Sequence, residues 1–212
     1  FYFLIAASLG ILLRLFPTTN VNANYKFIVH THSHVALLGW VYIGLTTLIF
    51  HLFIKEEAKK KYSKLFLSTQ VTILGMLVSF PITGYALFSI IFSTLFIICS
   101  YWFYAFFRKN NNFNKGSFAY KFINTSLIFM IISSVGPWAL GIIMNTLGST
   151  SHWYKNAIYF YLHFQYNGWF IFCLLGLFFH FLEKNNRVIS SKKISTFFRL
   201  MIASCIFTLA LS

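Results

Sequence analysis

Long apolar runs of about 20 residues alternate with short polar segments along the whole chain. A helix of that length crosses the roughly 30 Å hydrocarbon core of a bilayer. The runs are unbroken, whereas the strands of a membrane barrel are short and alternate in polarity. The pattern therefore predicts an all-α, polytopic transmembrane bundle of about seven helices. The expected spans are 1–16, 27–54, 65–84, 86–107, 122–146, 156–182 and 194–212.

Composition agrees with a lipid environment. The chain has 212 residues, of which 58% are hydrophobic and 21% aromatic, more apolar surface than a soluble domain of this size can bury. Its three acidic residues, Glu56, Glu57 and Glu183, all lie beside predicted cytoplasmic loops. No carboxylate is expected at mid-membrane, which excludes a carboxylate-based proton relay or ion-transport site from this stretch.

The net charge of +14 would suggest a nucleic-acid partner in a soluble protein, but here the cations mark topology. Most of them lie in or beside alternate loops, which the positive-inside rule places in the cytoplasm together with the N-terminus. We therefore expect no nucleic-acid partner. These cations are Lys55, Lys59, Lys60, Lys61, Lys64, Arg108, Lys109, Lys115, Lys121, Lys184, Arg187, Lys192, Lys193 and Arg199.

The sequence contains an internal repeat. Residues 25–55 align without a gap on residues 154–184, with ten identities that pair His34 with His163, Gly39 with Gly168 and Trp40 with Trp169. Weaker similarity extends on both sides, so the repeating unit is four helices. We expect a first unit at 1–121 and a second at 122–212 that is incomplete at its C-terminus, and we expect the chain to be a fragment of a longer protein.

Two histidines at matched depth are the first candidate site. Both aligned helices run from outside to inside, so His34 and His163 lie roughly 10 Å below the outer boundary at about 1.5 Å per residue. Two imidazoles on repeat-related helices can face each other across a shared cavity. A bis-histidine heme or a bound metal ion requires that geometry.

Further polar residues surround this pair. His30, His32 and His34 fall within five residues of an apolar helix, where unpaired polar groups are costly. They bind a heme or metal, or they hydrogen-bond to neighbouring helices. Gln165 and Asn167 give His163 a polar cavity that orients its ring or holds water. Gly39 and Gly168 permit close approach of a helix or of a flat macrocycle.

Arg14 is a candidate anion partner at the outer end of the first helix. A half-buried guanidinium needs a negative charge, which a heme propionate or a lipid phosphate supplies.

These motifs resemble those of the heme–copper oxidase catalytic subunit and its nitric-oxide-reductase relatives. His-Thr-His-Ser-His-Val-Ala-Leu-Leu-Gly-Trp at 30–40 is similar to the second-helix motif that ligates the low-spin heme, and 159–166, with His163-Phe-Gln-Tyr, is similar to the run that ligates both hemes. Gln165 stands where one ligand would be. The resemblance implies a divergent homologue from Bacteroidetes-type bacteria, in the inner (plasma) membrane. It covers about 60 residues well, the rest by topology alone.

The chain departs from this family at the copper site, because it has no adjacent His-His pair and no His-Pro-Glu motif. Oxidase activity is therefore left open, and copper is not supported by a motif. The first hypothesis is a respiratory electron-transfer hemoprotein with heme b held by His34 and His163. His30 or His32 would serve as an alternative ligand or support, and Arg14 as propionate partner. Its expected partners are an electron-transfer protein at the outer face and other membrane subunits.

The second hypothesis is a heme-free transporter or metal-handling protein that binds copper or zinc through His34, His163 and His30. A third is a structural or sensory subunit whose histidines pack against neighbouring helices.

Overall fold

The computed structural model describes residues 1–185 and 190–211, and Arg187, one of the predicted cytoplasmic cations, lies outside them. The described residues form helices and no strand, so the predicted all-α class is confirmed. Six helices are long and apolar enough to cross a membrane, and the N-terminal helix is a shorter apolar one. The chain divides into two compact units, residues 1–112 and the part from Phe113 onward.

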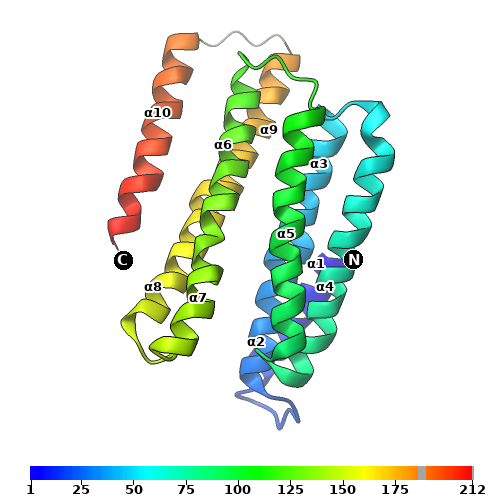
Figure 1. The fold of residues 1–212 in the computed structure, drawn as a ribbon, viewed down its shortest axis with the longest axis vertical. Coiled ribbons are helices and arrows are strands. Elements are labelled where there is room, and N and C mark those ends of the chain that lie inside the picture. Colours follow the sequence, from blue (N-terminus) through cyan, green and yellow to red (C-terminus); the bar gives the residue numbers. More distant parts are fainter. Residues whose placement is uncertain (186–189, 212) are drawn as a thin grey trace. The chain divides into compact units, whose positions relative to one another are not determined.

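The first unit contains five α-helices and a π-helical segment (Figure 1). α2, η1 and α3 follow one another without a break and form one long span. α1 packs on α2 and η1, and α4 packs on α2 and on α5. The bounds are α1 Tyr2–Leu15, α2 Tyr25–His34, η1 Val35–Tyr42, α3 Ile43–Phe53, α4 Lys59–Thr83 and α5 Leu87–Asn110, with a 3-10 turn, η2, at Glu56–Ala58.

Aromatic side chains fill the interior of the first unit. Phe50 stacks on Tyr62 with ring centroids 3.8 Å apart, and Tyr42 meets Phe96 edge to face at 4.8 Å. Such pairs add stability beyond the area they bury. At the basic end, the loop after α3 pairs with the end of α5, because the Lys55 amide donates to the Asn110 carbonyl at 3.2 Å. The cations of both loops therefore lie at one end of this unit.

The second unit consists of two long helical spans and a final helix. α6 and α7 form one apolar span, and α8, η3 and α9 form another. α9 and η3 pack on α6, and α8 packs on α7, whereas α10 touches α6 and η3 more sparsely. The bounds are α6 Phe118–Ser133, α7 Val135–Thr146, α8 His152–His163, η3 Phe164–Phe170, α9 Ile171–Lys184 and α10 Ser191–Phe207, followed by a 3-10 turn, η4, at Thr208–Leu211.

Polar caps define where the helices of the second unit begin. Ser117 Oγ accepts a hydrogen bond from the Tyr120 amide at 3.1 Å, and Glu183 Oε1 accepts from the Phe118 amide at 2.9 Å. A carboxylate at a helix N-terminus satisfies otherwise unpaired donors and complements the helix dipole. α6 therefore begins at Phe118, so the predicted unit boundary at 121/122 falls inside its first turn.

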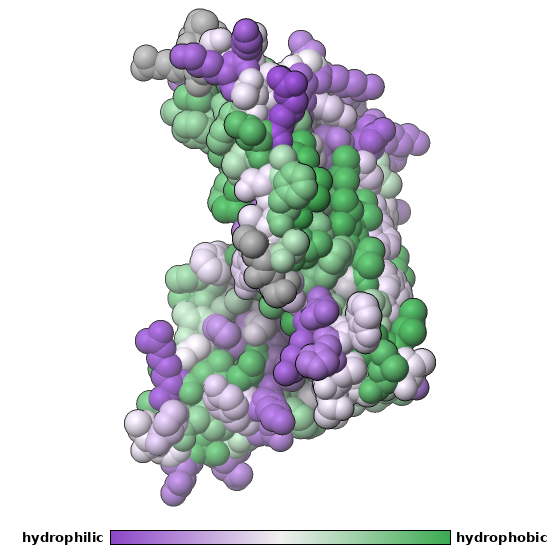
Figure 2. Space-filling view, turned by 90° about the vertical axis from the view of Figure 1, so that its left-hand side faces the viewer, coloured by the Kyte–Doolittle hydropathy of each residue, from purple (hydrophilic) through white to green (hydrophobic). Residues whose placement is uncertain are grey.

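The surface matches a membrane environment. Figure 2 shows hydrophilic side chains gathered at the top of one face, hydrophobic side chains below them over its middle, and both kinds mixed in its lower part. Large apolar residues such as Leu174, Phe178 and Phe181 on α9 are exposed, at 53%, 53% and 61%. Exposed apolar area on this scale indicates lipid as the surrounding medium.

We predict that Gly136→Ala destabilises the second unit, because α7 and α8 touch at this glycine. A Cβ there would lie 2.6 Å from the Ala157 carbonyl oxygen and 2.8 Å from Tyr161 Cβ, so the backbones must separate at a cost of about 1–3 kcal/mol. The matched control is Gly141→Ala on the same helix, where a Cβ meets nothing within 4 Å. Thermal unfolding in detergent should show a lower midpoint for Gly136→Ala alone, and equal midpoints would contradict the packing described.

Candidate functional site

The three clustered histidines of α2 point to different neighbours. His32 faces α1, where its Nδ1 donates to the Ala6 carbonyl at 2.9 Å. A Cβ on Gly10 would lie 3.2 Å from His32 Cε1, so this glycine leaves room for the ring. His32 therefore joins α1 to α2 by a hydrogen bond. Hydrocarbon contains no water to satisfy the ring, so the protein supplies the partner.

His34 is held by its own helix. Its Nδ1 lies 2.8 Å from the carbonyl oxygen of His30, and a carbonyl can only accept, so Nδ1 carries the proton. Nε2 of the neutral ring then bears the lone pair. The Tyr85 hydroxyl lies 3.3 Å from Nε2 and donates to it. The backbone thus fixes the His34 tautomer and turns Nε2 away from the helix.

Aromatic rings enclose this imidazole. The His34 and Phe80 ring centroids are 4.4 Å apart, and Tyr85 meets the His30 ring edge to face at 4.6 Å. Phe80 and Tyr85 also touch each other, at 5.0 Å. We call His30, His34, Phe80 and Tyr85 the histidine–aromatic cluster.

A π-helical segment, η1, begins directly after His34. π-helical turns widen the helix by one residue and are frequent at functional sites. Gly39 lies within η1, and a Cβ there would come within 3.0 Å of Tyr2 Cγ and 3.3 Å of Ile73 Cγ2. Gly39 is predicted to permit close approach either of a helix or of a flat macrocycle, and the structure shows the close approach of a neighbouring helix.

His163 is buried in the second unit, with 5% of its surface exposed. Its Nε2 donates to the Cys205 carbonyl of α10 at 2.8 Å. The Asn167 amide Nδ2 lies 3.3 Å from Nδ1 and donates to it. Both ring nitrogens are thus engaged, and the proton lies on the opposite nitrogen from that of His34.

Gln165 does not face the His163 ring in this arrangement. It is buried, and its Nε2 donates to Ser133 Oγ on α6 at 2.8 Å. Of the two amides predicted to surround His163, Asn167 orients the imidazole and Gln165 joins η3 to α6. Gln165 as a cofactor-binding residue stays a prediction.

The surroundings of the two aligned histidines share further features. η3 begins directly after His163, as η1 does after His34. Gly168 in η3 packs against Phe129 of α6, with a Cβ 2.6 Å from Phe129 Cβ, as Gly39 in η1 packs against Tyr2 of α1. His34 belongs to the first unit and His163 to the second. That the two imidazoles share a bound centre stays a prediction.

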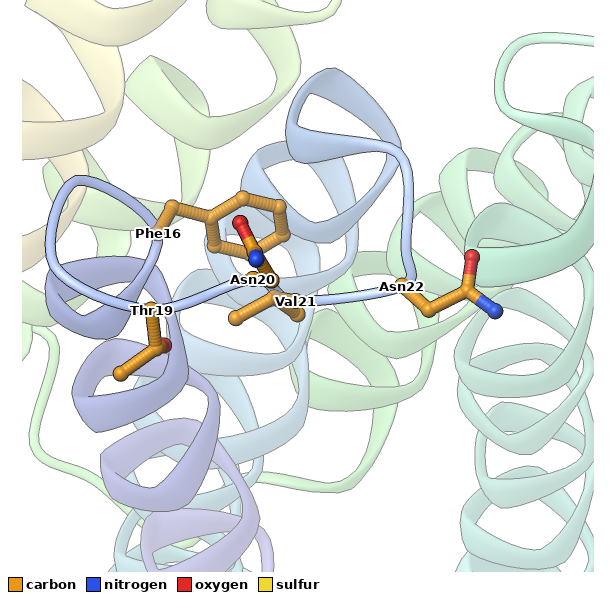
Figure 3. A pocket seen from close by; sticks show the side chains of 5 residues that line it. All are labelled: Phe16, Thr19, Asn20, Val21 and Asn22. Carbon is orange, nitrogen blue, oxygen red and sulfur yellow. The ribbon is translucent and has the colours of Figure 1, made fainter.

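Arg14 lies in the last turn of α1 with an exposed side chain. The loop that follows forms a hollow of about 420 Å³, lined by Phe16, Thr19, Asn20, Val21 and Asn22 (Figure 3). Its lining contains no histidine and no charged side chain. The burial expected for the Arg14 guanidinium is not found, and its pairing with a heme propionate or a lipid phosphate stays a prediction.

Among residues 1–185 and 190–211, no three His, Cys, Asp or Glu side chains come together as a group that could hold a metal ion. His30, which lies four residues before His34 on the same helical face and shares its contact with Tyr85, is the candidate for a second ligand beside it.

Sequence reasoning missed three features of these sites: Tyr85 and Phe80 beside His34, the Cys205 carbonyl beside His163, and the two π-helical segments. Tyr85 and Cys205 lie 51 and 42 residues from their histidine partners. A backbone carbonyl leaves no signal in the sequence. Gly84 before Tyr85 marks a turn, but not which helix the turn meets.

No protein-family model, no curated protein and no solved structure matches this chain. The likeness to heme–copper oxidase subunits therefore rests on the motifs at 30–40 and 159–166 and on the sequence similarity between residues 25–55 and 154–184.

We predict that His163→Leu loosens α10 in the heme-free protein, because it removes the hydrogen bond to the Cys205 carbonyl. A bond of this kind is worth about 0.5–1.5 kcal/mol, so amides of α10 near Cys205 should exchange with deuterium roughly two- to tenfold faster. His152→Leu, at the exposed start of the same helix, is the control. Unchanged exchange in His163→Leu would show that the ring does not secure α10.

Proposed function

We propose that this chain is an integral membrane hemoprotein of respiratory electron-transfer type, in which His34 supplies an axial ligand. The observation that carries the proposal is the 2.8 Å contact between His34 Nδ1 and the His30 carbonyl oxygen. Because the carbonyl can only accept, this contact assigns the proton to Nδ1 and leaves the Nε2 lone pair for a ligand. Ligating histidines almost always donate their other ring N–H to a carbonyl or carboxylate, which fixes the ring and raises its basicity.

The surroundings of His34 fit a heme ligand in three further respects. Its helix is apolar and lipid-embedded, which lowers the local dielectric and tunes a bound heme's potential. The side chain lies where α2 passes into the π-helical segment η1. Phe80 and Tyr85 shield the imidazole with aromatic surface that also packs well against a macrocycle.

His163 is the proposed second ligand, and it fits under one condition. Its Nε2 is committed to the Cys205 carbonyl at 2.8 Å, so ligation requires the ring to leave Cys205 or to use Nδ1 in place of the Asn167 contact. The internal repeat supports its assignment, since α8–η3–α9 follows the same order of helical segments as α2–η1–α3.

A bound heme b would supply one-electron transfer. The chain's own residues would hold and orient it: His34 and His163 as ligands, and His30 or His32 as an alternative or supporting residue. Arg14 would pair with a propionate. The resemblance to oxidase catalytic subunits supports electron exchange with a partner at the outer face and assembly with other membrane subunits. Reduction of oxygen or nitric oxide is not part of the proposal, because the copper-site motifs are missing from the sequence.

The proposed location is the inner membrane of a bacterium, with the N-terminus in the cytoplasm. In the first unit, the loop at Lys55 and the end of α5 with Arg108 and Lys109 lie together. His30 and His34 of the histidine–aromatic cluster lie on α2, the part of this span that precedes η1, far along the span from these cations. The positive-inside rule then puts the cations in the cytoplasm and the cluster toward the outer face.

A second candidate function is heme-free handling of copper or zinc. It is favoured by the spacing of His30 and His34, which lie four residues apart on one helical face and both contact Tyr85. Neutral imidazole nitrogens are good ligands for either metal.

We predict that the purified full chain shows a Soret band and a positive pyridine hemochrome assay, and that His34→Ala loses on the order of tenfold or more of its heme affinity. His51→Ala is the matched control, because His51 is exposed at the other end of the same span. A heme-free protein with stoichiometric copper or zinc by elemental analysis would replace the first function by the second. Heme retained fully in His34→Ala would remove His34 as the ligand.

A further inference from the structure

Tyr85 closes the one position on His34 from which a ligand can be bound. Its hydroxyl lies 3.3 Å from His34 Nε2, and its ring touches His30 and Phe80. The Nδ1 side of the same imidazole is already engaged by the His30 carbonyl. Any ligand of His34 must therefore take the lone pair to which Tyr85 donates.

The turn that carries Tyr85 is held in place by one contact with α2 and by hydrogen bonds to the start of α5. Gly84 has a φ of +60°, which favours glycine, and its Cα lies so close to the Phe27 ring that a Cβ would overlap it. Ser89 Oγ donates to the Gly84 carbonyl at 2.6 Å and accepts from the Ala86 amide at 2.9 Å. The backbone of the turn is thus held in place while the Tyr85 side chain extends from it.

The Tyr85 side chain itself is not part of the core. It is 52% exposed, whereas Phe80, which also packs on the His34 ring, is fully buried at 0%. Rotation of Tyr85 away from His34 therefore moves a side chain that is already half exposed. Such a rotation breaks the hydrogen bond to His34 Nε2.

We propose that Tyr85 is a displaceable cover of the His34 ligand position and sets how readily an electrophile or a metal centre reaches Nε2. One lone pair cannot accept a proton donor and bind a metal at the same time, so the hydroxyl and the ligand compete. The inference concerns access to His34; as applied to heme it rests on the function proposed above.

The first test measures access without any heme. Diethyl pyrocarbonate acylates an unprotonated imidazole nitrogen, and mass spectrometry of the full chain in detergent gives a rate for each histidine. Tyr85→Phe removes the hydroxyl and keeps the ring, so carbethoxylation of His34 should become roughly two- to tenfold faster, the range expected for loss of one hydrogen bond. The rate at exposed His51 should not change.

Tyr25→Phe is the matched control, because Tyr25 lies on α2 and is also 52% exposed. It should leave the His34 rate unchanged. A His34 rate that does not rise in Tyr85→Phe, or that rises equally in Tyr25→Phe, would overturn the inference and leave Tyr85 as a tyrosine of the membrane interface.

The second test uses hemin as the probe and separates this inference from the proposed function. Hemin titrated into heme-free protein should bind Tyr85→Phe with a roughly two- to tenfold lower dissociation constant than the unmodified chain. If neither protein binds hemin but His34 still reacts faster in Tyr85→Phe, Tyr85 does control access to His34, and the proposed heme function is wrong. If both proteins bind hemin equally and the His34 rate is unchanged, Tyr85 does not control access to His34, but the proposed heme function is supported.

Discussion

Lipid offers no hydrogen bonds, so each polar side chain of a membrane span must find its partner within the protein. Most of the hydroxyl groups here solve this locally by donating to a carbonyl three or four residues earlier, as Thr31 does to Phe27 at 2.8 Å and Ser133 to Met130 at 2.6 Å. An imidazole has two nitrogens and cannot be satisfied by one such bond. Each histidine therefore needs a hydrogen-bond partner for its second nitrogen, and that partner comes from a neighbouring element.

The two aligned histidines meet this constraint in opposite ways. His163 is satisfied inside its unit, with Nε2 on the Cys205 carbonyl and Nδ1 beside Asn167. His34 uses its own helix for Nδ1 and depends on the half-exposed Tyr85 for Nε2. One ring serves packing in this arrangement, whereas the other retains a nitrogen whose partner can be exchanged. This difference makes His34 the stronger ligand candidate, although the two histidines occupy equivalent positions in the sequence alignment.

Much of the fold follows from hydrophobic run length alone, because a bilayer imposes a fixed thickness on a helix. The predicted spans, the all-α class and the position of the basic loops needed no knowledge of tertiary contacts. The details of the site did need it. The periodicity that places His30 and His34 on one helical face cannot show that the turn at Gly84 brings Tyr85 to them. The same limit applies to Gln165, whose partner Ser133 lies on a different helix. The change from α- to π-helix after each aligned histidine also leaves no simple pattern in the sequence.

The proposed roles of the two aligned histidines depend most on which nitrogen of each ring carries the proton. Nitrogen-15 NMR of the heme-free chain, labelled in its histidine rings, measures this directly when His34→Ala and His163→Ala spectra supply the assignments. We expect His34 to be protonated at Nδ1 with an unprotonated Nε2, and His163 to be protonated at Nε2 with an unprotonated Nδ1. A His34 ring protonated at Nε2 would contradict the account, because that nitrogen would then have no lone pair to offer a ligand.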